Sequence, residues 1–146
     1  MITNKIELVG TLDVTVTDSN GNVVDSQHIK NLIVDAGKEL VANRLKDNTQ
    51  AAIGWIAVGT DGTAAGAGQT ALEAEVARAA VSSAVVTANS ITYTATFGAG
   101  TGTGTLLEAG LFNDATVGTM LSRTASINVV KGATDTLTIV WTITAN

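Results

Sequence analysis

Hydrophobic and polar residues alternate near the end of the chain, over residues 134–144. One set of alternate positions holds Leu137, Ile139, Trp141 and Ile143, and the other set includes Thr136, Thr138, Thr142 and Thr144. Side chains two residues apart lie on the same face of a β-strand, so this pattern predicts a strand with one buried face. Such an apolar strand is not stable alone, and we therefore expect other strands beside it and a second sheet facing it.

A second alternating segment, residues 5–17, predicts a long strand with one buried and one solvated face. The pair Asn20-Gly21 follows it, and both residue types tolerate the positive φ angles of a tight hairpin turn. We therefore expect a hairpin whose returning strand covers residues 23–34. The apolar run at residues 32–34 indicates burial on both faces near the end of that strand.

One helix is predicted, from Ala36 to about Lys46. Asp35 precedes it and is expected to be its N-cap, because a side-chain oxygen at that position can accept a hydrogen bond from a first-turn amide. Leu40, Val41 and Leu45 form a narrow apolar stripe. We therefore expect the helix to pack on the end or the side of the sheets.

The middle of the chain predicts further short strands separated by turn residues. The expected strands are residues 53–59, 80–86, 91–97, 106–112 and 120–130. Residues 59–70 are expected to form a long structureless loop, and residues 72–78 an extended or one-turn segment. About eight or nine short strands predict an all-β fold. We expect a single domain over residues 1–146, an antiparallel β-sandwich of jelly-roll or immunoglobulin-like type with one short α-helix near residues 36–46.

The charge of the chain argues against two classes of partner. Only 14% of the residues are charged, the 8 Lys and Arg are scattered, and the net charge is −5. Nucleic acids and anionic membranes attract clustered cations, so we expect neither as a partner. The first residues lack the apolar run of a signal peptide, and no segment reaches the roughly 20 apolar residues that span a bilayer. We therefore expect a protein that is made and used without secretion.

The low charge content also bears on assembly. Charged residues average about 25% in soluble proteins, so this chain has less polar cover than a free-standing monomer usually has. Part of its surface is therefore expected to be buried against other copies or another subunit, with a dimer or a trimer as the expected homo-oligomer. The chain contains no cysteine, which excludes disulfides and thiolate metal sites.

Two features invite a chemical interpretation. His28 is the only histidine, and no residue near it in the sequence stands out as a catalytic partner, so we expect a surface or interface histidine. The alternating glycines of residues 98–104 are similar in composition to a phosphate-binding loop. A strand follows them rather than a helix, and no P-loop lysine is present, so the segment is expected to be a hairpin tip.

Acidic residues offer two further candidates. Glu73, Glu75 and Glu108 are candidates for a catalytic pair, but glycosidase-type chemistry needs an aromatic-lined groove, and the chain has only 2 Phe, 1 Tyr and 2 Trp. The oxygen ligands of residues 18–25 lack an EF-hand pattern and suit a β-turn. A G-x-S-x-G motif is also missing. We therefore assign no catalytic, cofactor-binding or metal-binding residue and expect a protein that is not an enzyme.

Five stretches, taken in order, carry a resemblance to a known group of proteins. They are NLIVDAGKELVANRL (31–45), WIAVGTDGTAAGAGQTALEAEVAR (55–78), ITYTATFGAGTGTGTLLEAGLFN (91–113), GTMLSRT (118–124) and KGATDTLTIVWTIT (131–144). Together they resemble small structural proteins of tailed bacteriophages, described as head decoration (cement) proteins or as tail-fibre-type proteins. These motifs are structural, so the resemblance implies no catalytic or ligand-binding residue.

The resemblance implies a virion protein assembled in the host cytoplasm. Our first hypothesis is a capsid decoration protein that binds the outer surface of the major capsid protein and reinforces the shell. The alternative is a tail-fibre, collar or baseplate module that contacts tail proteins. Two segments poor in charge are the expected subunit contacts, and their candidate residues are Met1, Ile2, Thr3, Asn4 and Lys5, followed by Thr60, Asp61, Thr63 and Gln69.

Overall fold

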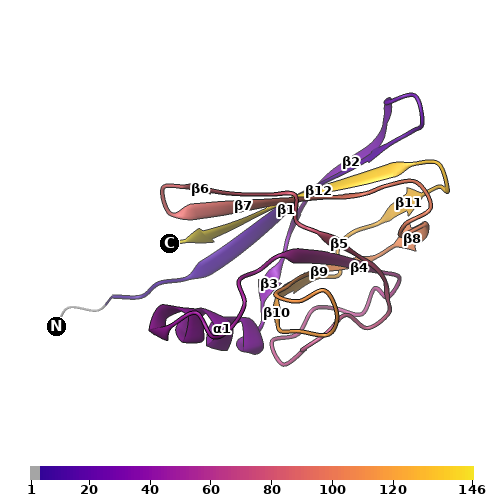
Figure 1. Ribbon diagram of the computed structural model, residues 1–146. Coiled ribbons are helices and arrows are strands. Elements are labelled where there is room, and N and C mark those ends of the chain that lie inside the picture. Colours follow the sequence, from indigo (N-terminus) through magenta and orange to yellow (C-terminus); the bar gives the residue numbers. More distant parts are fainter. Residues whose placement is uncertain (1–3) are drawn as a thin grey trace.

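Two antiparallel sheets of five strands each pack face to face in the computed structural model, which describes residues 4–146 (Figure 1). The long sheet has the order β2-β1-β12-β7-β6, with bounds β2 Val23–Lys30, β1 Leu8–Thr17, β12 Thr136–Ala145, β7 Ser90–Phe97 and β6 Ser83–Thr87. The short sheet has the order β3-β10-β9-β4-β5, with bounds β3 Leu32–Ile33, β10 Met120–Thr124, β9 Glu108–Phe112, β4 Trp55–Gly59 and β5 Glu75–Ala80. The predicted all-β sandwich with one short helix is confirmed.

The final strand, β12, lies at the centre of the long sheet, as its alternation predicts. It pairs with β1 on one side and β7 on the other. Its apolar side chains point into the space between the sheets, where Leu137, Ile139 and Trp141 are completely buried. On the same inner face lie Leu12, Val14, Ala95 and Phe97, and the short sheet contributes Ile56, Val58 and Leu111. Burial of these side chains is the main force that holds the two sheets together.

Three of the predicted strands are each divided into two, which corrects the expected strand count. Residues 23–34 form β2 and then β3, and residues 120–130 form β10 and then β11 (Val129–Lys131). Residues 106–112 divide between β9 and β8 (Gly104–Leu106), and β8 pairs with β11 in a separate two-stranded sheet. At the first division, the backbone N–H of Asn31 still bonds Gly10 of β1, while Leu32 already pairs with Arg123 of β10. Hydrophobic periodicity follows burial alone, and burial continues when a strand changes sheets.

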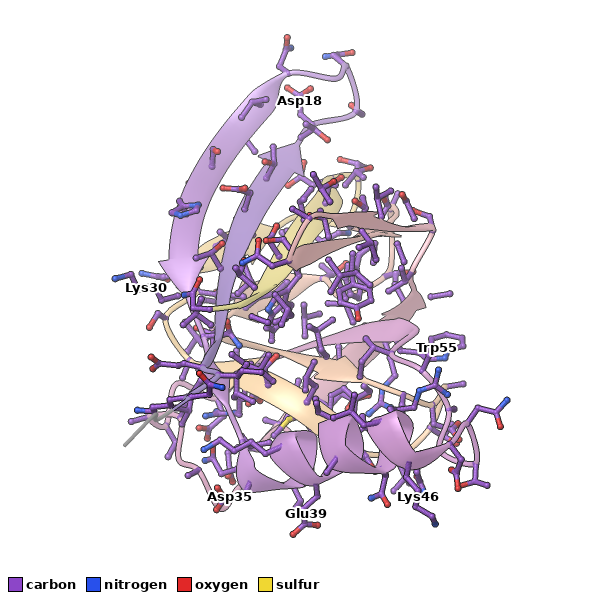
Figure 2. The ribbon with its side chains drawn as sticks, turned by 90° about the vertical axis from the view of Figure 1, so that its left-hand side faces the viewer. Asp18, Lys30, Asp35, Glu39, Lys46 and Trp55 are labelled. Carbon is purple, nitrogen blue, oxygen red and sulfur yellow. The ribbon has the colours of Figure 1, made fainter. Side chains whose placement is uncertain are left out.

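The helix α1 (Asp35–Lys46) lies beside the short sheet, at the opposite end of the molecule from the tip of the β1–β2 hairpin (Figure 2). The predicted N-cap is wrong by one residue. Val34 occupies the cap position without a side-chain hydrogen bond, and Asp35 is in the first turn, where its N–H donates to Ala67. The predicted apolar stripe is also too wide, because Leu40 is buried but Leu45 is 85% exposed.

Gly37 sets how closely α1 approaches β10. A β-carbon at this position would overlap the backbone carbonyl of Leu121, so only glycine allows the observed contact. In an open helix, replacing glycine by alanine stabilises by about 1 kcal/mol. Here we expect Gly37→Ala to lower the free energy of unfolding by roughly 1–3 kcal/mol, because the helix must move away from the sheet.

Urea denaturation measures this difference. Gly54→Ala is the control, since a β-carbon there would approach only the Ala52 carbonyl, at 3.9 Å. An unchanged or raised stability of Gly37→Ala would show that the helix is free to shift without cost.

Candidate functional site

A buried ion pair joins the two central strands of the short sheet. Glu108 in β9 and Arg123 in β10 are both fully buried. The Nε and Nη2 groups of Arg123 donate to Glu108 Oε2 at 3.0 and 2.8 Å. A charge without a partner at such a site would be strongly destabilising, so the burial of each residue depends on the opposite charge of the other.

The ion pair holds the segment of residues 60–74, which we call the anchored loop. Arg123 Nη1 donates to the carbonyl oxygen of Thr63 at 2.8 Å and to Gln69 Oε1 at 3.2 Å. The Glu108 carboxylate accepts the backbone N–H groups of Glu73 at 3.0 Å and Ala74 at 2.7 Å. Both ends of the loop are therefore tied to one buried pair. The segment contains no helix or strand, as predicted, but these contacts fix its shape.

The loop also makes bonds within itself. The backbone N–H of Thr60 donates to the Ala74 carbonyl at 3.1 Å, which closes its base. Gln69 accepts the backbone N–H of Gly66 at 2.9 Å and donates to Glu73 Oε1 at 3.2 Å. These bonds use backbone groups that would otherwise need water, so they fix the shape of a segment rich in Gly, Ala and Thr.

The predicted contact residues fall into three groups in the structure. Met1, Ile2 and Thr3 lie outside the described residues, whereas Asn4 and Lys5 are exposed and precede β1. Thr60 and Thr63 are exposed on the anchored loop, whereas Gln69 is half-buried and engaged by Arg123. Asp61 is half-buried and accepts the N–H of Thr63 at 2.7 Å. Hydrogen bonds from the side chain and backbone of Thr63 lower the pKa of Asp61.

The start of β1 and the anchored loop are brought together at Asn31, where the chain crosses between the sheets. The backbone N–H of Asn31 bonds the Gly10 carbonyl at 3.1 Å, and its side chain packs against Gly10. On its other side, Asn31 lines a shallow depression with Gly62 and Ala64 of the anchored loop. Asn31 therefore links β1 to the anchored loop.

The outward face of the long sheet is a broad array of threonines, which we call the threonine face. Its members are Thr11, Thr15 and Thr17 in β1, Thr136, Thr138, Thr142 and Thr144 in β12, and Thr92, Thr94 and Thr96 in β7. Neighbouring hydroxyls bond across the strands, as between Thr92 and Thr142 at 3.1 Å and between Ser90 and Thr144 at 2.7 Å. This face is mainly polar, with Asp13 and Val140 among the threonines and His28 and Lys30 at its β2 edge, and it offers a surface for contact rather than a pocket for a small molecule.

Comparisons with known proteins identify no relative of this chain. No protein-family model matches the chain, and no curated protein or solved structure matches it significantly. Among residues 4–146, no group of three or more His, Cys, Asp or Glu side chains is placed to hold a metal ion. Within the same residues, no helix has the length and apolar character needed to cross a membrane.

The three candidate carboxylates do not form a pair. Glu108 is buried under the anchored loop, while Glu75 bonds the guanidinium of Arg78 at 2.7 and 3.0 Å. Arg78 also stacks over the ring of Phe112, with its Cζ 3.8 Å from the ring centroid. Glu73 is exposed, and its carboxylate accepts a hydrogen bond from the Gln69 side chain. Each carboxylate is thus engaged in holding the fold.

His28 has a partner that its sequence neighbourhood does not reveal. Its Nδ1 lies 2.7 Å from Asp13 Oδ1, directly across the β1–β2 pair, and both side chains are more than half exposed. The signal was available in the hairpin register, because a turn centred on residues 20–21 places Asp13 opposite His28. An exposed pair of this kind contributes little to stability.

The first turn matches its predicted role, but the glycine-rich segment is not the predicted hairpin tip. Gly100, Gly102 and Gly104 have positive φ angles, and this segment connects β7 of the long sheet to β8, which pairs with β11 in the two-stranded sheet. The buried amine of Lys131 donates to the carbonyl of Gly98 at 2.8 Å, and burial lowers its pKa. In the first turn, Asp18 accepts the backbone N–H groups of Asn22 and Asn20, which lower the pKa of its carboxyl.

An open apolar groove lies between α1 and the inner-face ends of the long sheet, with a volume of about 460 Å³. Its walls include Leu40 and Val41 of the helix and Ile91, Tyr93 and Ile143 of the sheet. Burial raises the pKa of Tyr93. The groove contains few polar groups that could orient a substrate, so it is not a catalytic pocket by composition.

Proposed function

We propose that the chain is a structural protein of a bacteriophage virion, a decoration protein that binds the outer surface of the major capsid protein and reinforces the shell. The observation that supports this proposal is the anchored loop. It presents Gly, Ala and Thr residues with little charge, and it is tied down at both ends by the buried Glu108–Arg123 pair. The resemblance to phage structural proteins gives the proposal its specific partner.

A loop with a fixed shape suits a contact role for a thermodynamic reason. Binding through a flexible segment costs the entropy of ordering it, whereas a loop held in advance does not incur that cost. Decoration of a lattice repeats the same small contact many times, so each contact must form without a large rearrangement. The contact residues in this proposal are the exposed Thr60 and Thr63 of the anchored loop, together with the N-terminal segment.

Deleting residues 1–4 is expected to weaken binding to purified shells by about tenfold, which corresponds to ~1.4 kcal/mol of binding free energy. Thr60→Lys is expected to act similarly, because it places a charge on the anchored loop without touching Arg123 or Glu108. Occupancy is measured by sedimenting shells with increasing amounts of protein and quantifying what is bound.

Asn20→Lys is the matched control for charge, since Asn20 is exposed near the tip of the β1–β2 hairpin, far from the helix end of the molecule (Figure 2). It is expected to leave occupancy unchanged. Equal occupancy for the deletion, Thr60→Lys and the wild type would remove both segments from the contact.

Antibody labelling of intact particles distinguishes the head from the tail. Label distributed over the head agrees with decoration of the capsid. Label confined to the tail would replace this proposal with a tail-fibre, collar or baseplate module, which the same resemblance allows.

A further inference from the structure

The strand β6 is a free edge of the long sheet. It pairs with β7 on one side and has no strand on the other within residues 4–146 (Figure 1). All five of its residues are exposed, including Val85 at 54% and Val86 at 70%. No charged residue occurs in the sequence between Arg78 and Glu108, so β6 and its partner β7 are both uncharged.

The other edges of the two five-stranded sheets carry features that discourage pairing with a second chain. The β2 edge bears Asp25, His28 and Lys30, and the β1–β2 ladder contains a register shift. The β5 edge bears Glu75 and Arg78 and also has a register shift against β4. The β3 edge is only two residues long. Charges, bulges and short edge strands are the usual means by which proteins prevent edge pairing, and β6 has neither charge nor bulge.

We propose that β6 is a self-association edge, which pairs antiparallel with β6 of a second copy of this chain across a two-fold axis. The pairing joins two long sheets into one continuous sheet. A two-fold contact requires a self-complementary surface, and an uncharged strand meets this condition because it brings no like charges together.

The sequence of β6 favours a register centred on Val85. With the axis at this residue, Val85 faces its own counterpart, Ala84 faces Val86, and Ser83 faces Thr87. Val85 lies on the same side as the threonine face, because it pairs with Thr92 of β7. Val85 therefore meets its counterpart on the outer face, while Ala84 and Val86 meet on the other, so both sides of the new ladder gain apolar pairs.

The threonine face is thereby extended across the axis. Ser83 and Thr87 also lie on this side, through their pairs with Thr94 and Ser90. The contact is a single five-residue strand from each copy. Interfaces below about 1,200 Å² are typical of weak and transient complexes, so the dimer forms in a concentration-dependent manner.

Cysteine substitution tests the register directly, because the natural chain has no cysteine. Val85→Cys places two thiols opposite each other at the axis, at a Cβ separation that allows a disulfide bond on mild oxidation. We expect a covalent dimer to accumulate at least fivefold faster than with Val24→Cys. Val24 serves as the reference position, because it lies on the β2 edge and its exposed fraction, 56%, is close to that of Val85.

Charge substitution gives an independent readout. The wild type is expected to shift from monomer towards dimer with rising concentration in sedimentation velocity, and Val85→Lys is expected to abolish the shift. Val24→Lys is expected to leave it intact, and circular dichroism checks that both variants remain folded. A wild type that stays monomeric at all concentrations would overturn the proposal. So would equal cross-linking of Val85→Cys and Val24→Cys together with equal loss of the dimer in Val85→Lys and Val24→Lys. The experiment uses only the purified chain, so its result does not depend on the proposed virion role.

Discussion

Arg123→Ala is expected to lower the free energy of unfolding by about 3–5 kcal/mol. The substitution removes the partner of a fully buried carboxylate and leaves Glu108 without a countercharge. It also removes the hydrogen bond that fixes the Thr63 carbonyl. The loss is expected to be global, because the ion pair lies in the two central strands of the short sheet. Urea denaturation followed by circular dichroism measures it.

Two variants make the result specific to the buried pair. Arg44→Ala removes an exposed arginine that donates a hydrogen bond to the Gln50 carbonyl, and it is expected to change stability by less than about 0.5 kcal/mol. The double variant Glu108→Leu with Arg123→Met removes both charges while keeping apolar volume. It is expected to recover part of the loss, but not all of it, because the N–H groups of Glu73 and Ala74 lose their acceptor.

Hydrogen exchange shows whether the anchored loop depends on the pair. In Arg123→Ala, amides of residues 60–74 are expected to exchange faster at urea concentrations where the rest of the chain is folded. A loss below about 1 kcal/mol with an unchanged exchange pattern would mean that the loop is held by other contacts, and the argument for a preorganised contact surface would fail with it.

Periodicity predicted those elements whose two faces differ most in environment. In β12 and β1, apolar side chains face the other sheet and threonines face outward, so the period of two is visible in the sequence. The strands of the short sheet show this period less clearly in the sequence. Its strands β9 and β10 are buried on both faces, because the anchored loop, with its residue Leu72, covers the outer side. A strand buried on both sides has no alternation to read.

The changes between sheets could not be predicted from local pattern. Asn31 lies in the middle of an apolar segment, and nothing in its neighbours indicates that Leu32 pairs with Arg123 rather than with β1. Contacts of this kind join residues about ninety positions apart, so they depend on the global arrangement of strands. The length of the loop at residues 60–74 also does not predict its fixed shape, because that shape depends on hydrogen bonds to Glu108 and Arg123, which are distant in the sequence.

The sequence also contains a pattern that predicts the buried ion pair. Glu108 and Arg123 are the only charged residues in two otherwise apolar or small-residue strands. A single charge within each of two buried strands, with opposite signs, predicts a pairing between them, because an unpaired charge at either place would be too costly. That argument identifies the anchor, although it does not identify which loop the anchor holds.

Trp141→Ala is expected to lower the free energy of unfolding by about 3–5 kcal/mol, comparable to the loss of the ion pair but for a different reason. Trp141 is completely buried at the centre of the long sheet, between Leu12 of β1 and Tyr93 of β7. Truncation leaves a cavity that two packed sheets cannot close. Trp55, the other tryptophan, is half-buried at the start of β4, and Trp55→Ala is expected to cost less than half as much.

Trp141→Phe separates packing from hydrogen bonding at the same position. The indole Nε1 of Trp141 is buried and has no hydrogen-bond partner among residues 4–146, so the wild type already bears the cost of an unsatisfied donor. Phenylalanine removes this donor while keeping an aromatic ring, and we expect a loss below about 1.5 kcal/mol. Urea denaturation of the three variants is expected to give the largest loss for Trp141→Ala. If Trp141→Phe were as damaging as Trp141→Ala, the indole N–H would have to be engaged, and the packing around β12 would differ from that described.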